Sequence, residues 1–357
     1  MDNIVKREVR KMSQVKRVLV IDDSAYVRKV VTQILSRSPF LEVVGTARDG
    51  KDALEKVEAL NPDVVTCDLI MPEMDGVQFV REQMKRRHLP VIIMSVASET
   101  AEMALTALEV GAIDFVQKPT ALATDKILEI SEELIAKVKA AADISSSRLP
   151  VIEAPKPTKL ATTLPRTEAV DIVVLGISTG GPQALRYLVP QLPANLNVPL
   201  AIVMHMPVGY TEMYAKKLNE SSNLEFREAN EGDVLEQGVA LLAPAGRHLT
   251  FNRSVEGKVV AHLDARPFET QHRPSVDVLF RSAAETYGPR VLGVVMTGMG
   301  TDGKEGASWI KARGGLIYTE SEDSCVVYGM PRTIVEAGLS DKSVPLDAMA
   351  QAIWEVV

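Results

Sequence analysis

The sequence has few cysteines, no long apolar run and no excess of positive charge. Two cysteines among 357 residues are too few for a disulfide framework or a closed zinc site, so we expect two buried thiols. The longest apolar stretches fall far short of the roughly 18 residues that span a bilayer. We therefore expect a soluble, cytoplasmic protein without membrane insertion. The net charge of −7 gives no reason to expect nucleic acid as a partner.

The pattern of short β-branched runs alternating with helical segments indicates α/β architecture in two successive parts of the chain. Between them, residues 143–169 hold four prolines among polar residues, which is typical of a linker. We expect a disordered lead-in or a docking arm at 1–16, one domain at 17–142 and a second domain at 170–357, each with a mostly parallel, doubly wound sheet.

In the first domain, polar residues end the predicted strands. These strands are 17–21, 41–47, 64–67, 91–95 and 115–117. Asp22, Asp23, Asp68, Ser95 and Lys118 follow or close strands, and the carboxyl ends of parallel strands meet at one edge of a sheet. Three converging carboxylates repel one another unless a cation lies among them, and Mg²⁺ suits oxygen ligands. A carboxylate beside such an ion can accept a phosphoryl group, with the lysine adding a second positive charge.

The motifs VLVIDDSAYVRK, CDLIMPEMDG, PVIIMSV and DFVQKP resemble those of a response-regulator receiver domain over its full length. The resemblance implies a flavodoxin-like (βα)5 fold and phosphorylation of Asp68 by a histidine kinase. It also implies that Asp23, Asp68 and the carbonyl group of Ile70 hold Mg²⁺, with Asp22 acting through water.

The same resemblance implies a pair of switch residues, Ser95 and Phe115. The hydroxyl group would turn toward the phosphoryl oxygens while the aromatic ring moves inward. Lys118 would contact the phosphoryl group, and the peptide bond between Lys118 and Pro119 would be cis.

The second domain opens with a strand at 171–175 that runs into the segment GISTGGP and then a helix. Small residues around Ser178 would expose its hydroxyl group at a helix N-terminus, where free N–H groups can stabilise an oxyanion. This pattern predicts a nucleophilic serine. A phosphate-binding loop is the alternative, although neither the Gly-x-Gly-x-x-Gly nor the Gly-Lys-Ser/Thr pattern is present.

A nucleophilic serine needs a base, and His205 is the favoured candidate because it ends the predicted strand 200–204 at the same edge as Ser178. His272, before a helix, is the second choice. His248 and His262 belong to a predicted hairpin or loop and to a polar-alternating strand, respectively. Asp302, in the glycine-rich turn after a third apolar strand, would orient the base.

Six segments resemble the catalytic domain of the chemotaxis protein-glutamate methylesterase (CheB) family across residues 171–357: GISTGGPQAL, MHMPVGYTEMYAKKLN, APAGRHL, RPSVDVLFRSAAETYG, VVMTGMGTDGKEGA and SCVVYGMPRTIVEAG. The resemblance implies Ser178 as nucleophile, His205 as base and Asp302 as its partner. Thr179 and Met299 would flank the site, with the Met299 backbone holding the oxyanion.

The implied reaction is hydrolysis of glutamate methyl esters, and deamidation of glutamines, on methyl-accepting chemoreceptors. The implied partners are these receptors and the histidine kinase of the chemotaxis system, and the hydrolase would be a monomer without a cofactor. Met204 and Ile177 stand where glutamine and alanine are usual, which leaves substrate preference open. A related sensory pathway and an inactive scaffold remain alternatives. The size, the near-neutral charge and the glycine-rich strand ends of the second domain argue against a helix-turn-helix regulator.

Overall fold

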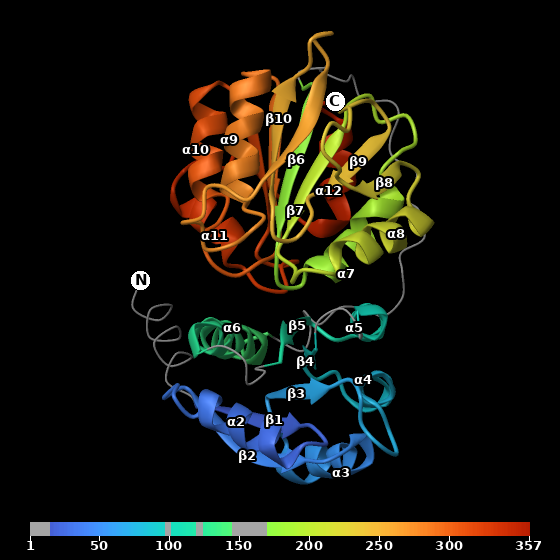
Figure 1. Ribbon diagram of the computed structural model, residues 1–357, viewed down its shortest axis with the longest axis vertical. Coiled ribbons are helices and arrows are strands. Elements are labelled where there is room, and N and C mark those ends of the chain that lie inside the picture. The colour runs from blue at the N-terminus through green and yellow to red at the C-terminus, as the bar shows by residue number, and fades with distance from the viewer. Residues whose placement is uncertain (1–14, 97–100, 119–123, 145–169) are drawn as a thin grey trace. The chain divides into compact units, whose positions relative to one another are not determined.

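The computed structural model describes residues 15–96, 101–118, 124–144 and 170–357, with only the backbone of 124–129. The chain divides into two compact units, at 1–152 and 153–357, and each is described by itself (Figure 1). Both cysteines are free and buried, as expected. Among the described helices, none is long and apolar enough to cross a bilayer.

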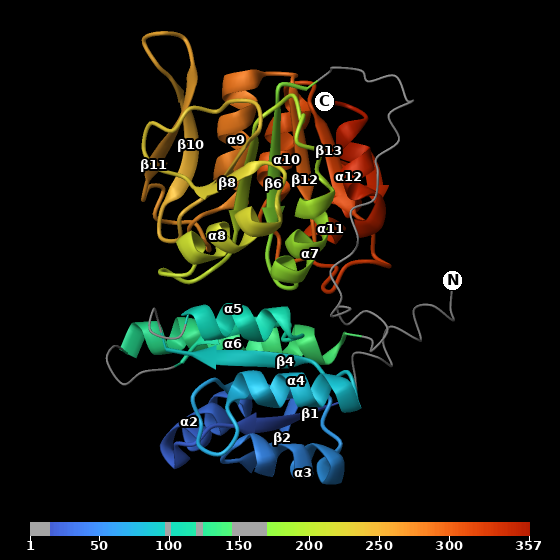
Figure 2. The same ribbon diagram turned by 90° about the vertical axis from the view of Figure 1, so that its right-hand side faces the viewer.

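The first unit is a five-stranded parallel sheet in the order β2-β1-β3-β4-β5 (Figures 1 and 2). Its helices pack in two groups, α2 with α6, and α3 with α4 and α5. The strands are β1 (Lys16–Ile21), β2 (Leu41–Ala47), β3 (Val64–Asp68), β4 (Val91–Ser95) and β5 (Asp114–Gln117). The helices are α2 (Ala25–Leu35), α3 (Gly50–Leu60), α4 (Gly76–Arg86), α5 (Ala101–Glu109) and α6 (Thr124–Ala142).

Local sequence signals explain where these helices begin. The side chain of Ser24 accepts a hydrogen bond from the N–H of Val27, and Asp49 caps α3 in the same way through Asp52. Asp75 and Gln78 form a reciprocal capping box at the start of α4. The central strands β3 and β4 are buried along their whole length, so their apolar runs fit a sheet covered on both faces.

The second unit contains a seven-stranded parallel sheet in the order β14-β13-β12-β6-β7-β9-β8 and a separate antiparallel hairpin, β10-β11 (Figure 1). The strands are β6 (Ile172–Ile177), β7 (Leu200–Met204), β8 (Glu225–Glu228), β9 (Val239–Leu242), β10 (His248–Arg253), β11 (Val259–Asp264), β12 (Val291–Val295), β13 (Leu316–Glu320) and β14 (Lys342–Val344). The helices are α7 (Gly181–Leu188), the 3₁₀ turn η2 (Val189–Gln191), α8 (Thr211–Ser221), α9 (Val276–Tyr287), α10 (Lys304–Ala312), α11 (Met330–Glu336) and α12 (Leu346–Trp354).

Helix α9 joins the hairpin to the large sheet. It packs against β6 and β12 on one side and against β10 on the other, as Figure 2 also shows. Phe280 on α9 is fully buried, and the hydroxyl group of Ser282 accepts a hydrogen bond of 2.8 Å from the N–H of Phe251 in β10. The start of α9 lies near the carboxyl end of β6, since a Cβ atom on Gly176 would lie 2.3 Å from Cγ1 of Val276.

The observed elements agree closely with the sequence analysis. Every strand range given in the sequence analysis is present within two residues of its predicted ends, and the helix predicted after Ser178 is α7. The predicted linker lies largely in 145–169, outside the described residues, as does the predicted lead-in up to residue 14. The Lys118–Pro119 peptide bond also lies outside them, because Pro119 is not described.

Candidate active site and phosphoacceptor site

Ser178 directly follows β6, in the turn that leads into α7. Gly180 has a positive φ of 78° and caps the helix, and the N–H of Gly181 donates to the carbonyl oxygen of Ser178 at 2.7 Å. The N–H of Ser178 donates to the carbonyl oxygen of Thr297, 3.0 Å away, in the segment after β12. Ser178 is 9% exposed. The strand-turn-helix predicted from the sequence is therefore present and holds the serine at an edge of the sheet.

His205 follows β7, the strand beside β6. Ile177 pairs with Met204, so the residues that come next lie at adjacent strand ends. The Nδ1 atom of His205 lies 3.1 Å from the Oγ atom of Ser178. The favoured base is thus within hydrogen-bonding distance of the serine.

Asp302 lies on the far side of the imidazole ring. Its Oδ2 atom is 2.8 Å from the Nε2 atom of His205. A carboxylate can only accept, so Nε2 carries the proton, which leaves Nδ1 free to accept the hydroxyl proton of Ser178. The ring tautomer required of a general base therefore follows from the contact with Asp302.

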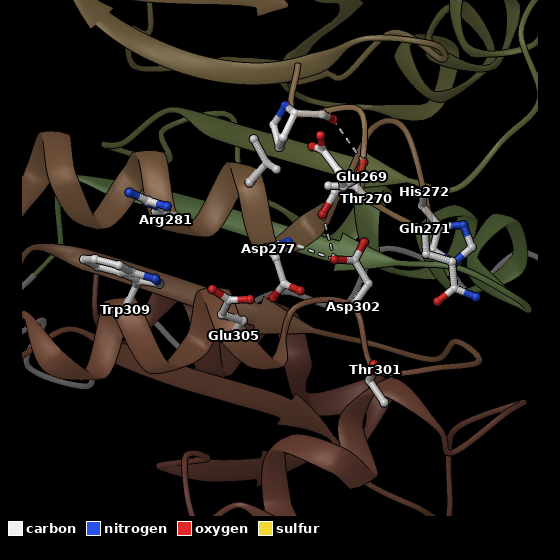
Figure 3. Close-up of a pocket in the computed structure, with 13 residues that line it drawn as sticks. Glu269, Thr270, Gln271, His272, Asp277, Arg281, Thr301, Asp302, Glu305 and Trp309 are labelled. Atoms are coloured by element: carbon white, nitrogen blue, oxygen red, sulfur yellow. Dashed lines mark hydrogen bonds between the residues drawn. The ribbon is translucent and has the colours of Figure 1, made fainter. Parts of the chain in front are cut away.

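Three further donors hold Asp302 at the N-terminus of α9. The Oγ atom of Ser275 lies 2.8 Å from Oδ1, and the backbone N–H of Val276 donates at 2.8 Å. The backbone N–H of Asp277 donates at 3.0 Å (Figure 3). Burial alone would raise the pKa of Asp302, but the hydrogen bond from His205 and the backbone N–H groups hold that pKa well below its usual range. Asp302 therefore stays ionised beside the imidazole.

The three other histidines of this unit hold different positions. The His272 ring stacks on the His205 ring, with 3.9 Å between the centroids. His248 is fully buried in β10, where its Nδ1 atom accepts from the N–H of Ser275 at 3.1 Å, and burial lowers its pKa. His262 contacts Glu231 at 2.8 Å. Of the four candidates, His205 is the one within hydrogen-bonding distance of Ser178.

The residues expected to flank the serine lie in two neighbouring turns. Thr179 is 1% exposed, and its Oγ1 atom has no hydrogen-bond partner within the described part of the chain. The segment that leads to Met299 packs tightly here, since a Cβ atom on Gly298 would lie 2.8 Å from the Cβ atom of Ser178. The carbonyl oxygen of Gly298 accepts from the N–H of Met330 at 2.8 Å. Residues 297–299 are thus fixed against the serine turn.

Sequence reasoning missed the residues that orient Asp302. Ser275 and His248 form a chain of hydrogen bonds that ends on this carboxylate, and Asp277 contacts it through its backbone. A polar residue directly before a helix was the available signal, because such a residue commonly caps the helix. Here the Ser275 side chain points to a distant loop instead, which local sequence does not reveal.

In the first unit, the expected phosphoacceptor residues come together at the carboxyl ends of β1, β3 and β5. The Nζ atom of Lys118 lies 2.7 Å from Oδ2 of Asp68 and 2.9 Å from Oδ2 of Asp22. Oxygen atoms of Asp22, Asp23 and Asp68 all lie within 4.8 Å of one another. The cluster combines three carboxylates with one ammonium group.

The surroundings of Asp68 disfavour the ionised form of its carboxyl group. Burial raises its pKa, the hydrogen bond from Lys118 opposes that rise, and the charge of Asp22 adds to it. Burial would lower the pKa of Lys118, but its hydrogen bonds with Asp68 and Asp22 raise it overall. Lys118 is therefore charged and compensates only part of the carboxylate repulsion.

The turn after Asp68 requires a glycine at position 76, since a Cβ atom there would lie 2.1 Å from the carbonyl oxygen of Asp68. Ile70, in this turn, is exposed. Ser95 and Phe115 lie on the neighbouring strands β4 and β5, and both side chains are buried. The structure thus brings Asp22, Asp23, Asp68 and Lys118 together at one edge of the sheet. Ser95 ends β4, whereas Phe115 lies within β5, opposite Ile93.

Comparison with known proteins gives matches in both units. A family model described as CheB methylesterase matches residues 173–353, and one described as response regulator receiver domain matches residues 18–130. A Myxococcus xanthus protein named protein-glutamate methylesterase/protein-glutamine glutaminase 5 is 50% identical over 93% of this chain and 95% of its own. A Methanosarcina acetivorans protein of the same name, numbered 2, is 43% identical over 96% of this chain and 99% of its own.

A solved structure also corresponds to the second unit. The crystal structure of the Thermotoga maritima CheB methylesterase catalytic domain is 38% identical, with a TM-score of 0.51. It covers 53% of this chain and 99% of that chain. The match agrees with the mostly parallel α/β fold of the second unit.

Proposed function

The chain belongs to the CheB methylesterase family and carries a response regulator receiver domain in front, and from this we propose that Ser178, His205 and Asp302 catalyse hydrolysis of glutamate methyl esters and glutamine amides on proteins. The observation that carries the proposal is one continuous chain of contacts. It runs from the serine Oγ atom to Nδ1 of the imidazole, 3.1 Å, and from Nε2 to the carboxylate, 2.8 Å.

Each residue has a distinct role in the proposed reaction. His205 takes the hydroxyl proton as Oγ of Ser178 attacks the side-chain carboxyl carbon of the glutamate methyl ester. The imidazolium then gives this proton to the leaving methoxide, and methanol departs. Water, deprotonated by His205, attacks the resulting acyl-enzyme and releases the glutamate carboxylate. With glutamine as substrate, the leaving group is ammonia.

Thr179 and Met299 are the proposed flanking residues, with the backbone N–H of Met299 facing the oxyanion of the tetrahedral intermediate. Two observations support this role. The Thr179 side chain is buried next to the nucleophile, and the segment 297–299 contacts the serine turn through Gly298. Donors held by the fold cost little reorganisation when charge develops, which favours catalysis.

We assign phosphorylation to Asp68, with transfer from a histidine kinase. Convergence of three carboxylates with a single lysine leaves excess negative charge, which fits a divalent cation of the Mg²⁺ type. Asp23, Asp68 and the Ile70 carbonyl would hold that ion, and Asp22 would act through water. Such an ion would supply charge neutralisation during phosphoryl transfer, and Lys118 contributes a second positive charge beside Asp68.

Ser95 and Phe115 would couple this phosphorylation to the rest of the receiver. Both are buried next to the phosphoacceptor edge, so a new charge on Asp68 changes their surroundings directly. Movement of the hydroxyl group toward the phosphoryl oxygens, with the ring following inward, is the proposed switch.

The proposed substrates are methyl-accepting chemoreceptors, and the proposed phosphodonor is the kinase of the same system. We place the enzyme in the cytoplasm, as a monomer that binds no nucleic acid and does not insert into the membrane. The hydrolase needs no cofactor in this scheme, because each proton transfer is assigned to a side chain.

Methanol release from methylated chemoreceptor membranes tests the proposal. We expect the full chain to release methanol, faster with a small phosphodonor, and Ser178→Ala to keep only a residual rate, lower by about 10⁴-fold or more. Asp68→Ala should keep the basal rate and lose the response to phosphodonor. Equal rates for the wild type and Ser178→Ala would contradict the catalytic assignment, and a response retained by Asp68→Ala would contradict the regulatory one.

A further inference from the structure

Thr297 follows the end of β12 and is fully buried beside the serine turn, residues 177–180. Its backbone carbonyl oxygen accepts from the N–H of Ser178 at 3.0 Å. Its side-chain hydroxyl group donates to the carbonyl oxygen of Thr179 at 2.9 Å. One residue therefore holds the nucleophile by its own N–H and by the carbonyl group of the residue that follows it. The proposed reaction gives Thr297 no role.

The same hydroxyl group binds a third segment, the connection between β13 and α11. Its oxygen accepts from the N–H of Val327 at 3.0 Å, while its single proton goes to Thr179. This connection also packs directly on the serine turn, since a Cβ atom on Gly180 would lie 2.5 Å from Cβ of Val326. Three segments that are distant in the chain thus meet at one hydroxyl group.

Glu320 anchors Thr297 from the neighbouring strand. The N–H of Thr297 donates to Oε2 of Glu320 at 2.8 Å, and Oε1 accepts from the hydroxyl group of Ser324 at 3.0 Å. Glu320 ends β13 and is fully buried, so both of its oxygens are held inside the fold. The N–H, the carbonyl group and the hydroxyl group of Thr297 therefore all have partners, which fixes its position closely.

A second buried threonine shows what a purely structural hydroxyl group does in this sheet. Thr319, in β13, is as fully buried as Thr297, and its Oγ1 atom lies 2.9 Å from the Oγ atom of Ser340. That contact involves no residue of the serine turn. The hydroxyl group of Thr297 differs because it binds the residue next to the nucleophile, and Met299 follows two positions later in the chain.

We propose that Thr297 is a positioning residue for the reaction proposed above, whose hydroxyl and carbonyl groups hold the serine turn in register with Met299. Oγ of Ser178 and the backbone N–H of Met299 then reach the carbon and the oxygen of the same substrate carbonyl group. Loss of the hydroxyl group leaves the carbonyl group of Thr179 and the N–H of Val327 without this partner, and the turn shifts.

Two pairs of proteins isolate the hydroxyl group. Thr297→Val keeps the shape of the wild-type side chain without the hydroxyl group, and Thr297→Ala differs from Thr297→Ser in the same way. We expect Thr297→Val to lower kcat by roughly 10- to 100-fold, because a small displacement of the nucleophile is costly. KM should stay within about twofold of the wild type, since Thr297 does not contact the substrate. Thr297→Ser should keep kcat within about threefold of the wild type, and Thr297→Ala should be about tenfold slower than Thr297→Ser.

Methanol release by the full chain is the measurement, at a temperature below the thermal unfolding of every variant. Thr319→Val is the matched control, because it removes an equally buried hydroxyl group and should lower stability while kcat stays within about threefold of the wild type. The inference is overturned by a folded Thr297→Val with the wild-type kcat, by equal kcat in Thr297→Ser and Thr297→Ala, or by an equal loss in Thr319→Val.

The inference rests on the proposed function, so Ser178→Ala is measured in parallel. The wild-type rate in that variant sinks the function itself, whereas the contrary outcomes for Thr297 sink only its positioning role. If Thr297→Val does not fold, the comparison of Thr297→Ser with Thr297→Ala decides the question, because both lack the methyl group and only one lacks the hydroxyl group.

Discussion

Nε2 of His205 and Oδ2 of Asp302 lie 2.8 Å apart, although 97 positions separate the two residues in the chain. The contact exists because β7 and β12 both end at the same edge of the large sheet as β6. It fixes the tautomer of the imidazole and leaves Nδ1 facing the serine. Parallel strand order therefore determines which histidine is the base.

Replacement of Asp302 by asparagine should reduce kcat by about 10³-fold or more. The carboxylate accepts from His205, Ser275, Val276 and Asp277, whereas an amide offers one oxygen and a competing N–H₂ group. The single amide oxygen can accept from His205 or from the N–H groups at the start of α9, so one of these hydrogen bonds is lost. Methanol release measures the loss, with circular dichroism as the check on folding, and a kcat within threefold of wild type would contradict the assigned role.

Asp68→Asn should increase the free energy of unfolding of the first unit at pH 7. Burial raises the pKa of Asp68 in the folded state, so its ionisation at neutral pH destabilises the fold. This cost shrinks as the pH falls through the folded pKa and is gone only below the pKa of the unfolded state. The stabilisation by asparagine should therefore shrink toward acidic pH. Urea unfolding at pH 7 and pH 4 measures it; a variant less stable than the wild type at pH 7 would refute this reasoning.

Gly298→Ala should impair both stability and activity. The added methyl group would lie 2.8 Å from Cβ of Ser178 and 2.5 Å from Sδ of Met330, closer than atoms approach without a shift. Overpacking of this kind costs about 1–3 kcal/mol, and a displaced nucleophile can lower kcat by about 10²-fold.

Gly257→Asn is the matched control for this substitution. Gly257 has a positive φ of 81° in the β10–β11 turn, with no neighbouring atom within 4 Å of an added Cβ, and asparagine tolerates that conformation. We expect thermal unfolding and methanol release close to wild type. Equal effects at the two positions would show that proximity to Ser178 is not the cause.

The sequence predicted the elements that bear the site, because apolar strands ending in a polar residue are a strong local signal. Ser178, His205 and Asp302 each follow such a strand, as do Asp22 and Lys118, while Asp68 closes β3. Strand β8 was missed, since its short EFRE segment alternates charged residues at the edge of the sheet. A charged edge strand lacks the apolar run that identifies a central one.

The surroundings of Asp302 could not be derived from local patterns. Ser275 contacts this residue from the start of a helix, and His248 holds Ser275 from a hairpin. These elements are distant from Asp302 in the chain, and their spacing carries no periodicity. Motif resemblance located the three catalytic candidates but gave no contacts for Asp277. Its backbone N–H donates to Asp302 and its carboxylate accepts from the N–H of Gly306, because α9 packs beside α10.

The central claim is that Ser178 and His205 act as one catalytic unit, and a double-mutant cycle tests it most directly. We would measure kcat for methanol release with Ser178→Ala, His205→Gln and the double variant. Groups that act together are strongly non-additive, so the double variant should be no slower than the slower single variant. Losses that multiply, or a single variant that keeps the wild-type rate, would contradict the account.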